Sequence, residues 1–379
     1  MTNISPTKIA FLITSTGWGG LEMNTLKLAK LLSEKGYSIT LITQENSSIY
    51  TQGKDIFAST VLLQKKRKYF DFGAAKKISA ALKTNGIDTI FVFDNKDLDV
   101  VAWTKKIFYK QLFVLYQQHM QIGINKKDFL HSFRFNAIDI WISPLEYLKK
   151  EVTLRTKFPE DKIRIVPLCL DTNQFTTKKY TQAEALSKLN IQPKAPLVGI
   201  IGRIGEKKGQ LFLVESLLKL KSKGTAIELL IFGSPTVNDP ECQIYYNRIL
   251  ETIKEHQLEA TVHIVPYQKD VALFYNAVDV FVLASHSETY GMVTIEAMLS
   301  GLPILATHAG GTSEILDYGK LGSLYEYENQ EDFCGKLISL LNNKDEASAF
   351  GKRAFENASK KYQQEIEVNG IDEIIKNRG

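Results

Sequence analysis

Residues 285–298 read Ser285-His286-Ser287-Glu288-Thr289-Tyr290-Gly291-Met292-Val293-Thr294-Ile295-Glu296-Ala297-Met298. A short apolar, β-branched run at residues 278–284 precedes them, and Gly301 and Pro303 stop the helix that they open. The order is strand, polar loop, helix and a further strand. In such a βαβ unit, ligands lie beyond the carboxyl ends of the strands, where the first helical turn offers unpaired N–H groups. We therefore predict an anion site at Gly291, where the backbone can approach a phosphate closely.

Two carboxylates, Glu288 and Glu296, belong to this stretch. Paired carboxylates serve as general acid and nucleophile in retaining glycosidases. Here one lies in the loop and the other nearly two turns into the helix, which argues against a shared scissile bond. The spacing favours one carboxylate on a sugar hydroxyl and the other on a ribose diol. A solvated loop glutamate and an exposed helical glutamate remain the alternative for this pair alone.

A second apolar strand enters a basic, glycine-rich loop within residues 197–209. Arg203 and Lys208 lie at the carboxyl end of that strand, where a guanidinium and an ammonium can neutralise a diphosphate without a metal. The loop has neither the P-loop pattern nor the dinucleotide spacing. Taken alone, a basic loop after a strand is usually solvated surface.

A third strand, at residues 8–13, leads into a turn that contains Gly19 and Gly20, and a helix follows. A glycine turn at a helix start is again an anion site. Glu22 occupies the place of the third glycine of the dinucleotide fingerprint, which argues against a simple NAD site. A turn needed only to reverse the chain is the alternative.

These three elements together resemble family 4 of the retaining glycosyltransferases, which has the two-domain GT-B fold, and the resemblance covers most of the chain. The family's pattern of Glu, seven residues and Glu matches Glu288 and Glu296. Its Gly-Arg loop with a later lysine matches Arg203 and Lys208, and its early Gly-Gly loop matches residues 19–20. Residues 309–314 resemble its Gly-Gly-x-x-Glu turn. Residues 167–175 resemble its interdomain Pro-Asn-Gly-Val-Asp segment, with Leu168-Cys169 in place of Asn-Gly, which leaves the local turn geometry open.

The resemblance implies that a nucleotide-diphosphate sugar is the donor, bound with no metal or other cofactor. The implied donor-binding residues are Gly19, Gly20, Arg203, Lys208, Glu288, Tyr290, Gly291, Met292, Val293, Thr294 and Glu296. Glu296 would hold the ribose, and Glu288 would contact the transferred sugar. His119, after the apolar run 112–116, resembles a histidine that family members place beside the reacting sugar. The implied catalytic residues are therefore Glu288, His119, Arg203 and Lys208, although a structural histidine at a strand end is the alternative for His119.

The implied reaction moves a hexose from a UDP- or GDP-sugar to a hydroxyl of a glycan or glycolipid, with retention of anomeric configuration. The protein's part would be to position donor and acceptor and to stabilise the departing diphosphate. Cell-envelope polysaccharide or lipopolysaccharide synthesis is the expected setting. Two other functions remain open: a sugar-nucleotide epimerase of similar fold, which would need no acceptor, and a non-catalytic nucleotide-sugar binding module, which would release no diphosphate.

A metal-dependent alternative rests on Asp97-Leu98-Asp99, which is formally an Asp-x-Asp motif. A divalent cation needs more oxygen ligands than this short pattern supplies. We expect Asp97 and Asp99 to begin the helix that carries Trp103. The sequence therefore predicts no metal site.

Composition is that of a soluble two-domain enzyme: 379 residues, 44% hydrophobic and 23% charged. No segment approaches the length of a spanning helix, and the amino terminus does not read as a signal peptide. Three widely separated cysteines, at 169, 242 and 334, suit a reducing compartment. We expect a cytoplasmic enzyme.

Positive charge is concentrated in residues 61–110, where eleven Lys or Arg stand against five Asp, a net of +6 that leaves −1 for the rest of the overall +5. Lys65-Lys66-Arg67-Lys68-Tyr69-Phe70 interleaves cations with aromatics. Basic region 65–110 could rest on an anionic membrane or grip an acidic acceptor, and a solvated loop is the alternative. No nucleic-acid motif accompanies it, so nucleic acid is not an expected partner.

Strands and helices alternate throughout, with no internal repeat. We predict an α/β protein of the GT-B fold, with two Rossmann-like doubly wound domains facing across a cleft. Residues 1–175 would form the acceptor-binding domain and residues 176–361 the donor-binding domain. In the relatives the last helix, residues 362–379 here, packs back on the first domain.

Overall fold

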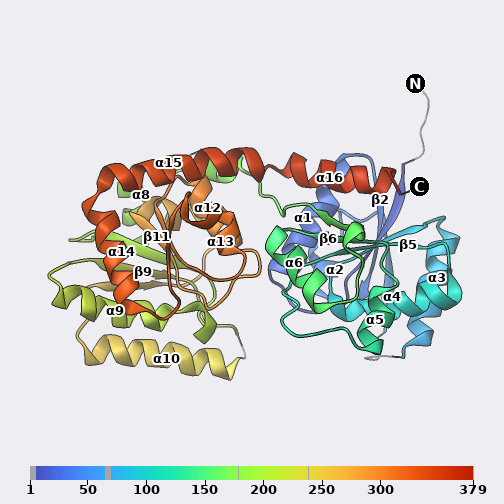
Figure 1. The fold of residues 1–379 in the computed structure, drawn as a ribbon, viewed down its shortest axis with the longest axis horizontal. Coiled ribbons are helices and arrows are strands. Elements are labelled where there is room, and N and C mark those ends of the chain that lie inside the picture. The colour runs from blue at the N-terminus through green and yellow to red at the C-terminus, as the bar shows by residue number, and fades with distance from the viewer. Residues whose placement is uncertain (1–5, 65–69, 178, 238, 379) are drawn as a thin grey trace. The chain divides into compact units, whose positions relative to one another are not determined.

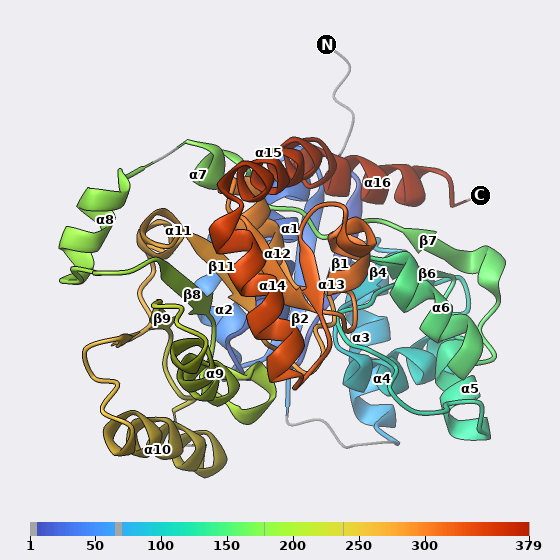
Figure 2. The same cartoon turned by 60° about the vertical axis from the view of Figure 1, so that its left-hand side comes forward.

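The computed structural model describes residues 6–64, 70–177, 179–237 and 239–378, and the chain forms two compact units (Figures 1 and 2). Unit 1 comprises residues 1–169 and 364–379, and unit 2 comprises residues 170–363. The division between the units therefore lies somewhat earlier than the predicted one at 175–176. The last helix, α16 (Gln364–Lys376), belongs to unit 1.

In its described part, unit 1 is built on a seven-stranded parallel sheet with the order β3-β2-β1-β4-β5-β6-β7. The strands are β1 (Lys8–Leu12), β2 (Ser38–Gln44), β3 (Ser59–Leu63), β4 (Thr89–Val92), β5 (Phe113–Gln117), β6 (Ile140–Ser143) and β7 (Ile163–Ile165). The helices, besides α16, are α1 (Gly20–Glu34), α2 (Ser48–Gln52), α3 (Phe72–Thr84), α4 (Leu98–Trp103), α5 (Phe129–Phe135) and α6 (Glu146–Arg155), with short helical turns η1 (Asn95–Asp97), η2 (Thr104–Phe108) and η3 (Glu160–Lys162).

Both faces of this sheet are covered, which explains why its central strands read as continuous apolar runs. In β1, Ala10 and Leu12 join one apolar cluster, whereas Ile9 and Phe11 join the cluster on the other face. The second cluster also contains Val368, Ile371 and Ile375 of α16. The carboxyl-terminal helix is therefore part of the core of unit 1.

Unit 2, as far as it is described, has a six-stranded parallel sheet with the order β10-β9-β8-β11-β12-β13. Its strands are β8 (Leu197–Ile201), β9 (Glu228–Phe232), β10 (Val262–Val265), β11 (Val280–Leu283), β12 (Ile304–Thr307) and β13 (Ser323–Tyr325). Its helices are α7 (Asn173–Thr176), α8 (Gln182–Leu189), α9 (Gln210–Ser222), α10 (Pro240–Glu255), α11 (Ala272–Ala277), α12 (Met292–Leu299), α13 (Thr312–Ile315), α14 (Gln330–Asn342) and α15 (Lys344–Lys361), with turns η4 (Glu206–Lys208) and η5 (Asp317–Gly319).

Both units therefore have the strand order of a doubly wound, Rossmann-like fold, which confirms the predicted fold class. The strand order reverses between β1 and β4 in unit 1, and between β8 and β11 in unit 2. Ligands of such sheets bind outside the carboxyl ends of the strands at these switch points. The glycine-rich loops of the sequence follow β1 and β8, and residues 284–291 follow β11. Across the described ranges, no helix combines the length and apolar character needed to cross a membrane.

Candidate functional site

The loops after β8 and β11 are joined at the switch point of unit 2. The N–H of His286 donates a hydrogen bond to the carbonyl of Lys207, with an N···O distance of 2.9 Å. Gly209 has a φ of +75°, and a Cβ there would lie 2.3 Å from the carbonyl oxygen of Ala284. Any larger residue would force the two loops apart. The glycine-rich pattern after β8 thus serves close backbone approach.

The approach of these loops brings together Lys208 and Glu288, which lie 80 positions apart in the sequence. Nζ of Lys208 lies 2.5 Å from Oε1 of Glu288, and the Ser285 hydroxyl donates to the same oxygen at 2.8 Å. The lysine side chain is 34% exposed and the glutamate side chain 15%. The ammonium of Lys208 is therefore still accessible to an anion. Because the ammonium is already paired with Glu288, the anion would share it with that carboxylate.

Arg203 and Lys208 line the same pocket, whose volume is about 510 Å³. The basic loop after β8 forms one wall, and Thr236 together with residues of the 239–248 segment forms another. Arg203 is exposed and makes no ion pair within the described part of the chain. The cations of the lining outnumber its acids by four to three: Arg203, Lys207, Lys208 and Arg248 against Glu206, Asp239 and Glu241. The predicted pair of phosphate-binding cations therefore shares one basic pocket.

Two buried hydroxyls face the space beside Gly291, the residue that precedes α12. Gly291 has a φ of +85°, and a Cβ there would lie 3.4 Å from Oγ1 of Thr294 and 3.5 Å from Oγ1 of Thr312. Both threonines are fully buried, and neither hydroxyl has a partner among the described residues. A buried hydroxyl without a partner is costly and calls for an explanation. This arrangement is that of a cradle for a hydrogen-bonding ligand.

Sequence reasoning named Thr294 but missed Thr312. The signal for Thr312 was present, because the residue directly follows the glycines of the 309–314 turn. The structure ties that turn to the glutamate loop, since the N–H of Gly311 donates to the carbonyl of Glu288 at 2.9 Å. Thr312 is thereby held beside Gly291, although it comes from the loop after another strand.

Glu296 lies on α12 and accepts a hydrogen bond from the Tyr275 hydroxyl, with an O···O distance of 2.7 Å to Oε2. Burial raises the pKa of the Glu296 carboxyl, and the bond from Tyr275 acts in the opposite direction. Nothing in the apolar sequence of α11 marked Tyr275 for this role. The predicted neighbours differ in their exposure: Tyr290 is buried, whereas Met292 and Val293 are half-buried.

In unit 1, Glu22 organises the loop of Gly19 and Gly20. Its carboxylate accepts hydrogen bonds from the N–H of Gly19 at 2.9 Å and from the hydroxyl of Ser15 at 2.5 Å. Glu22 is itself buried, with 4% of its surface exposed. The residue that replaces the third dinucleotide glycine therefore determines the shape of this loop.

The aspartates of the Asp-x-Asp motif make protein contacts. Asp97 is fully buried and accepts hydrogen bonds from the backbone N–H of Thr14 at 2.9 Å and from its hydroxyl at 2.5 Å. Asp99 pairs with Arg134 at 3.2 Å. The expected helix does begin here, at Leu98, but the Asp97 side chain holds the end of β1 and does not cap the helix. Three or more metal-ligating side chains do not come together anywhere in the described residues.

His119 follows β5 and is partly buried. Burial, with a smaller effect from the nearby charge of Lys27, lowers the pKa of His119 to about 3. Its Nε2 atom is buried and has no hydrogen-bond partner within the described ranges. The imidazole is therefore neutral at physiological pH.

The structure thus brings nine of the predicted residues to the switch point of unit 2: Arg203, Lys208, Glu288, Tyr290, Gly291, Met292, Val293, Thr294 and Glu296. Gly19, Gly20 and His119 belong to unit 1. Each lies beyond the carboxyl end of a strand of that unit, β1 for the glycines and β5 for the histidine.

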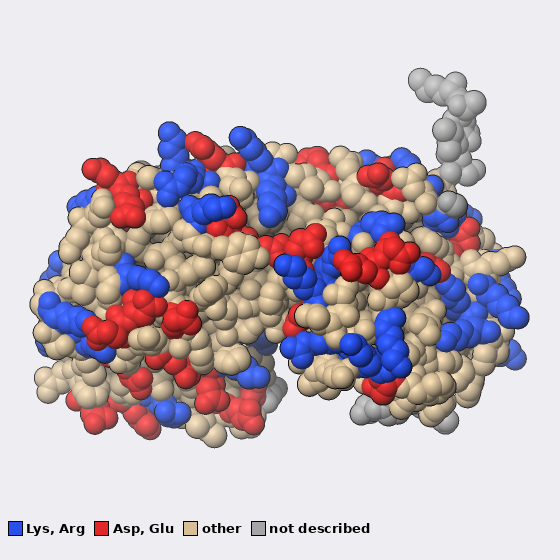
Figure 3. Space-filling model, in the orientation of Figure 1, with Lys and Arg blue, Asp and Glu red and all other residues tan. Residues whose placement is uncertain are grey.

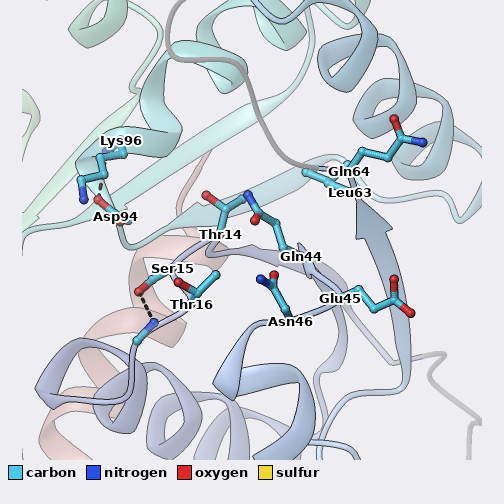
Figure 4. A pocket seen from close by; sticks show the side chains of 11 residues that line it. Thr14, Ser15, Thr16, Gln44, Glu45, Asn46, Leu63, Gln64, Asp94 and Lys96 are labelled. Carbon is cyan, nitrogen blue, oxygen red and sulfur yellow. Dashed lines mark hydrogen bonds between the residues drawn. The ribbon is translucent and has the colours of Figure 1, made fainter. Parts of the chain in front are cut away.

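Unit 1 also has a larger pocket, with a volume of about 1020 Å³ (Figure 4). It lies at the carboxyl ends of β1, β2, β3 and β4, beside the switch point of this unit. Its lining begins with Thr14, Ser15, Thr16 and Gly17, directly before the Gly19–Gly20 turn. Sequence reasoning did not single out the residues that line it.

Two family models match the chain. The model described as Glycosyl transferases group 1 matches residues 181–357, and the model described as Glycosyltransferase Family 4 matches residues 18–174. Among characterised proteins, the chain is 30% identical to D-inositol 3-phosphate glycosyltransferase of Nocardia farcinica over 52% of this chain and 44% of that protein. It is 29% identical to a sulfoquinovosyl transferase of Arabidopsis thaliana over 60% of this chain and 42% of that protein. The chain spans about half the length of the curated relatives it matches.

Solved structures share the whole fold. A glycosyltransferase from Rickettsia africae has a TM-score of 0.87 at 20% identity, with 98% of each chain covered. The HepE protein of Anabaena, solved in complex with UDP and glucose, has a TM-score of 0.81 at 18% identity, with 98% of this chain and 100% of that one covered. Both likenesses extend over almost the full chain, so they cover the fold of both units.

Proposed function

The chain belongs to the family 4, group 1 glycosyltransferases, and from this we propose that it transfers a sugar from a nucleotide-diphosphate sugar to a hydroxyl of an acceptor. One observation carries the proposal: the Lys208–Glu288 pair lies at the switch point of unit 2, between a basic pocket and the cradle of buried hydroxyls at Gly291. Arg203 and Lys208 of the basic pocket can bind a diphosphate, and the Glu288 carboxylate and the threonine hydroxyls can bind a sugar.

In the proposed reaction, Arg203, Lys208 and the backbone N–H groups at the start of α12 neutralise the diphosphate. Glu296 accepts hydrogen bonds from the ribose, and Glu288 accepts them from the transferred hexose. The amides at Gly19 and Gly20 contribute from unit 1. Tyr290, Met292 and Val293 contribute through their backbone.

The bond between the anomeric carbon and the phosphate oxygen breaks while the acceptor oxygen bonds to the same face of the sugar. The departing phosphate takes the acceptor's proton, so the anomeric configuration is retained and no enzymic base is needed. A neutral His119 suits this mechanism, because it can accept or donate a hydrogen bond beside the sugar without adding charge. The protein's contribution is then positioning and electrostatic stabilisation.

The direct test is turnover of Arg203→Ala and Lys208→Ala. Each should lower kcat on the order of 100- to 1,000-fold, as removal of one preorganised charge donor does in other enzymes. Lys352→Ala is a matched control, because Lys352 is an exposed lysine on α15 of the same unit. Unchanged turnover in both site variants would overturn the assignment. Conversion of the nucleotide sugar without any acceptor would instead indicate an epimerase.

The nucleotide and the absence of a metal requirement are tested together by calorimetric titration with UDP and GDP in excess chelator. UDP is the first choice, because a protein of the same fold is known in complex with UDP and glucose. Binding of one nucleotide in chelator, lost in Arg203→Ala, supports a metal-free donor site. Activity that disappears in chelator would contradict it.

We also propose a cytoplasmic enzyme that acts in envelope polysaccharide or glycolipid synthesis, with unit 1 resting on the inner face of an anionic membrane. Residues 65–69 lie outside the described residues. In the described part of region 65–110, Lys77, Lys83 and Lys106 donate to backbone carbonyls, and Lys105 pairs with Asp139. Lys and Arg side chains gather at several places on the face of unit 1 drawn in Figure 3.

The membrane proposal therefore rests mainly on the run Lys65–Lys68. Replacement of these four cations by glutamine should release the protein from vesicles that contain phosphatidylglycerol, measured by co-sedimentation at low salt. Replacement of Lys77 and Lys83 is the control, since these lysines already bond to carbonyls of unit 1. Equal vesicle binding by the wild type and the four-residue variant would refute the proposal.

A further inference from the structure

The larger pocket of unit 1 is distinguished by the chemistry of its walls (Figure 4). Three hydroxyl side chains come from the loop after β1, and three amides come from the ends of β2 and β3: Thr14, Ser15, Thr16, Gln44, Asn46 and Gln64. In the view of Figure 4 the hydroxyls lie in the middle, with Glu45 and Asn46 to one side and Asp94 and Lys96 to the other. The walls are therefore dominated by neutral hydrogen-bonding groups.

Two classes of ligand fit this lining poorly. Leu63 is the one apolar side chain among the described residues of the lining, and none of these residues is aromatic, so little apolar surface is available to a lipid chain. The charged groups among the described lining residues are Glu45, Asp94 and Lys96, which sum to −1. A phosphate would meet net repulsion from these groups.

Buried hydrogen bonds fix the backbone segments that line the pocket. Ser47, fully buried, caps α2 through the N–H of Tyr50 at 3.3 Å and accepts a hydrogen bond from Thr43 at 2.9 Å. These bonds hold the turn that presents residues 44–46. On the opposite side, Asp97 holds Thr14 and Glu22 holds Ser15. The pocket is preorganised, which lowers the entropic cost of binding.

Three side chains on the 44–46 turn remain available to a ligand. Gln44, Glu45 and Asn46 make no side-chain hydrogen bond or ion pair within the residues that the structure describes, and Glu45 and Asn46 are exposed. An amide offers both donors and an acceptor, so it can bind two neighbouring hydroxyls of a sugar ring at once.

We propose that this pocket binds an uncharged sugar unit of the acceptor, and that Gln44 and Asn46 are the residues that select it. The inference rests on the proposed function, since it names the acceptor class of that reaction. Glu45 contributes by rejecting acceptors that carry phosphate at the bound sugar.

The proposal is tested first by binding. Glucose, galactose, N-acetylglucosamine and glucose 6-phosphate are compared as probes by saturation-transfer NMR on the whole protein, without nucleotide. At least one neutral sugar should bind more tightly than glucose 6-phosphate. Gln44→Ala and Asn46→Ala should each weaken its binding about 3- to 10-fold, the cost of one or two lost hydrogen bonds. Asn136→Ala is the matched control, because Asn136 is exposed elsewhere in unit 1.

Transfer kinetics provide the second test. Gln44→Ala and Asn46→Ala should raise the KM for acceptor by a similar factor, with the KM for nucleotide sugar and the affinity for UDP unchanged. Glu45→Lys should shift preference toward glucose 6-phosphate relative to glucose. A merely structural role for these residues would instead alter donor and acceptor parameters together.

The outcomes separate this inference from the proposed function. Tighter binding of glucose 6-phosphate than of every neutral sugar, or binding insensitive to Gln44→Ala and Asn46→Ala, would overturn the inference while Arg203-dependent UDP binding still stands. The proposed function fails differently, through the absence of UDP binding and of transfer. Even in that case, the NMR experiment would show whether the pocket binds neutral sugars.

Discussion

The hydroxyls of Thr294 and Thr312 are buried and unpartnered within the described chain, and this has opposite consequences for stability and for binding. Valine has nearly the same shape and removes the desolvation cost of the hydroxyl. Thr294→Val and Thr312→Val should therefore stabilise the free protein by about 1 kcal/mol each and weaken UDP-glucose about 3- to 10-fold. Thermal denaturation and calorimetric titration measure the two effects.

Thr307→Val is the matched control for these variants. Thr307 is equally buried, but its hydroxyl donates to the carbonyl of Ser285 at 2.8 Å. Its replacement should destabilise the protein by about 1 kcal/mol, because a buried acceptor loses its partner. If Thr294→Val and Thr312→Val lowered the melting temperature as Thr307→Val does, their hydroxyls would have to be satisfied in the free protein.

Tyr275 should control the pH dependence of nucleotide binding through Glu296. Binding of the ribose requires the ionised carboxylate, and the bond from Tyr275 favours that form. In Tyr275→Phe the pKa of Glu296 should rise further, because burial then acts unopposed. As the pH is lowered from 8 toward 5, the affinity of the variant for UDP should fall at a higher pH than that of the wild type.

The measurement is the dissociation constant of UDP across this range, with folding checked by circular dichroism at each pH. Tyr246→Phe on α10 of the same unit is the control. A pH profile of Tyr275→Phe that is lowered uniformly, without a shift, would mean that Tyr275 acts only through packing.

At the scale of elements, α16 is anchored to unit 1 by its apolar residues and by two buried carboxylates, of which Glu367 is the more deeply buried. Glu367 has no exposed surface, pairs with Lys27 of α1 at 2.7 Å, and accepts the N–H of Cys169 at 2.9 Å. Cys169 occupies the position where the resemblance places a glycine. The turn there is secured by a side chain from the distant helix.

Glu367→Ala should destabilise unit 1 by about 2 to 4 kcal/mol, because it leaves a largely buried lysine without its counter-ion. Urea denaturation followed by far-UV circular dichroism measures the loss. Glu34→Ala is the control: its partner Lys30 lies 3.9 Å away, and the two side chains are 60% and 66% exposed. That variant should change stability by less than about 0.5 kcal/mol. Equal effects of the two substitutions would contradict the anchoring role.

At the scale of the whole molecule, the two units differ in the number of chain segments that form them. Unit 2 is a continuous segment, closed by a hydrogen bond from the N–H of Leu170 to the carbonyl of Tyr362 at 3.0 Å. Unit 1 needs residues 364–379, which complete one of its apolar clusters. A fragment of residues 170–363 should therefore fold cooperatively, whereas residues 1–169 alone should melt at a lower temperature than unit 1 does in the full chain.

The isolated 170–363 fragment should also bind UDP, and Arg203→Ala within it should abolish that binding. Calorimetry on the fragment and on the full chain measures the difference. A folded fragment with no affinity for UDP would contradict a nucleotide site formed by unit 2 alone.

Element types, the two-unit organisation and the glycine-rich loops could be predicted from the sequence, because apolar periodicity and the conformational limits of glycine and proline act locally. The Arg203–Lys208 and Glu288–Glu296 pairs could be found for the same reason: each has a fixed spacing within one strand-loop-helix segment.

The tertiary structure alone decided which segments meet. Lys208 pairs with Glu288, Tyr275 bonds to Glu296, and Thr312 faces Gly291 because β8, β11 and β12 lie side by side in one sheet. Asp97 holds Thr14 for the corresponding reason in unit 1, where β1 and β4 are neighbours. Strand order depends on long-range pairing, to which the residues of any one segment contribute only a part, so no local pattern encodes it.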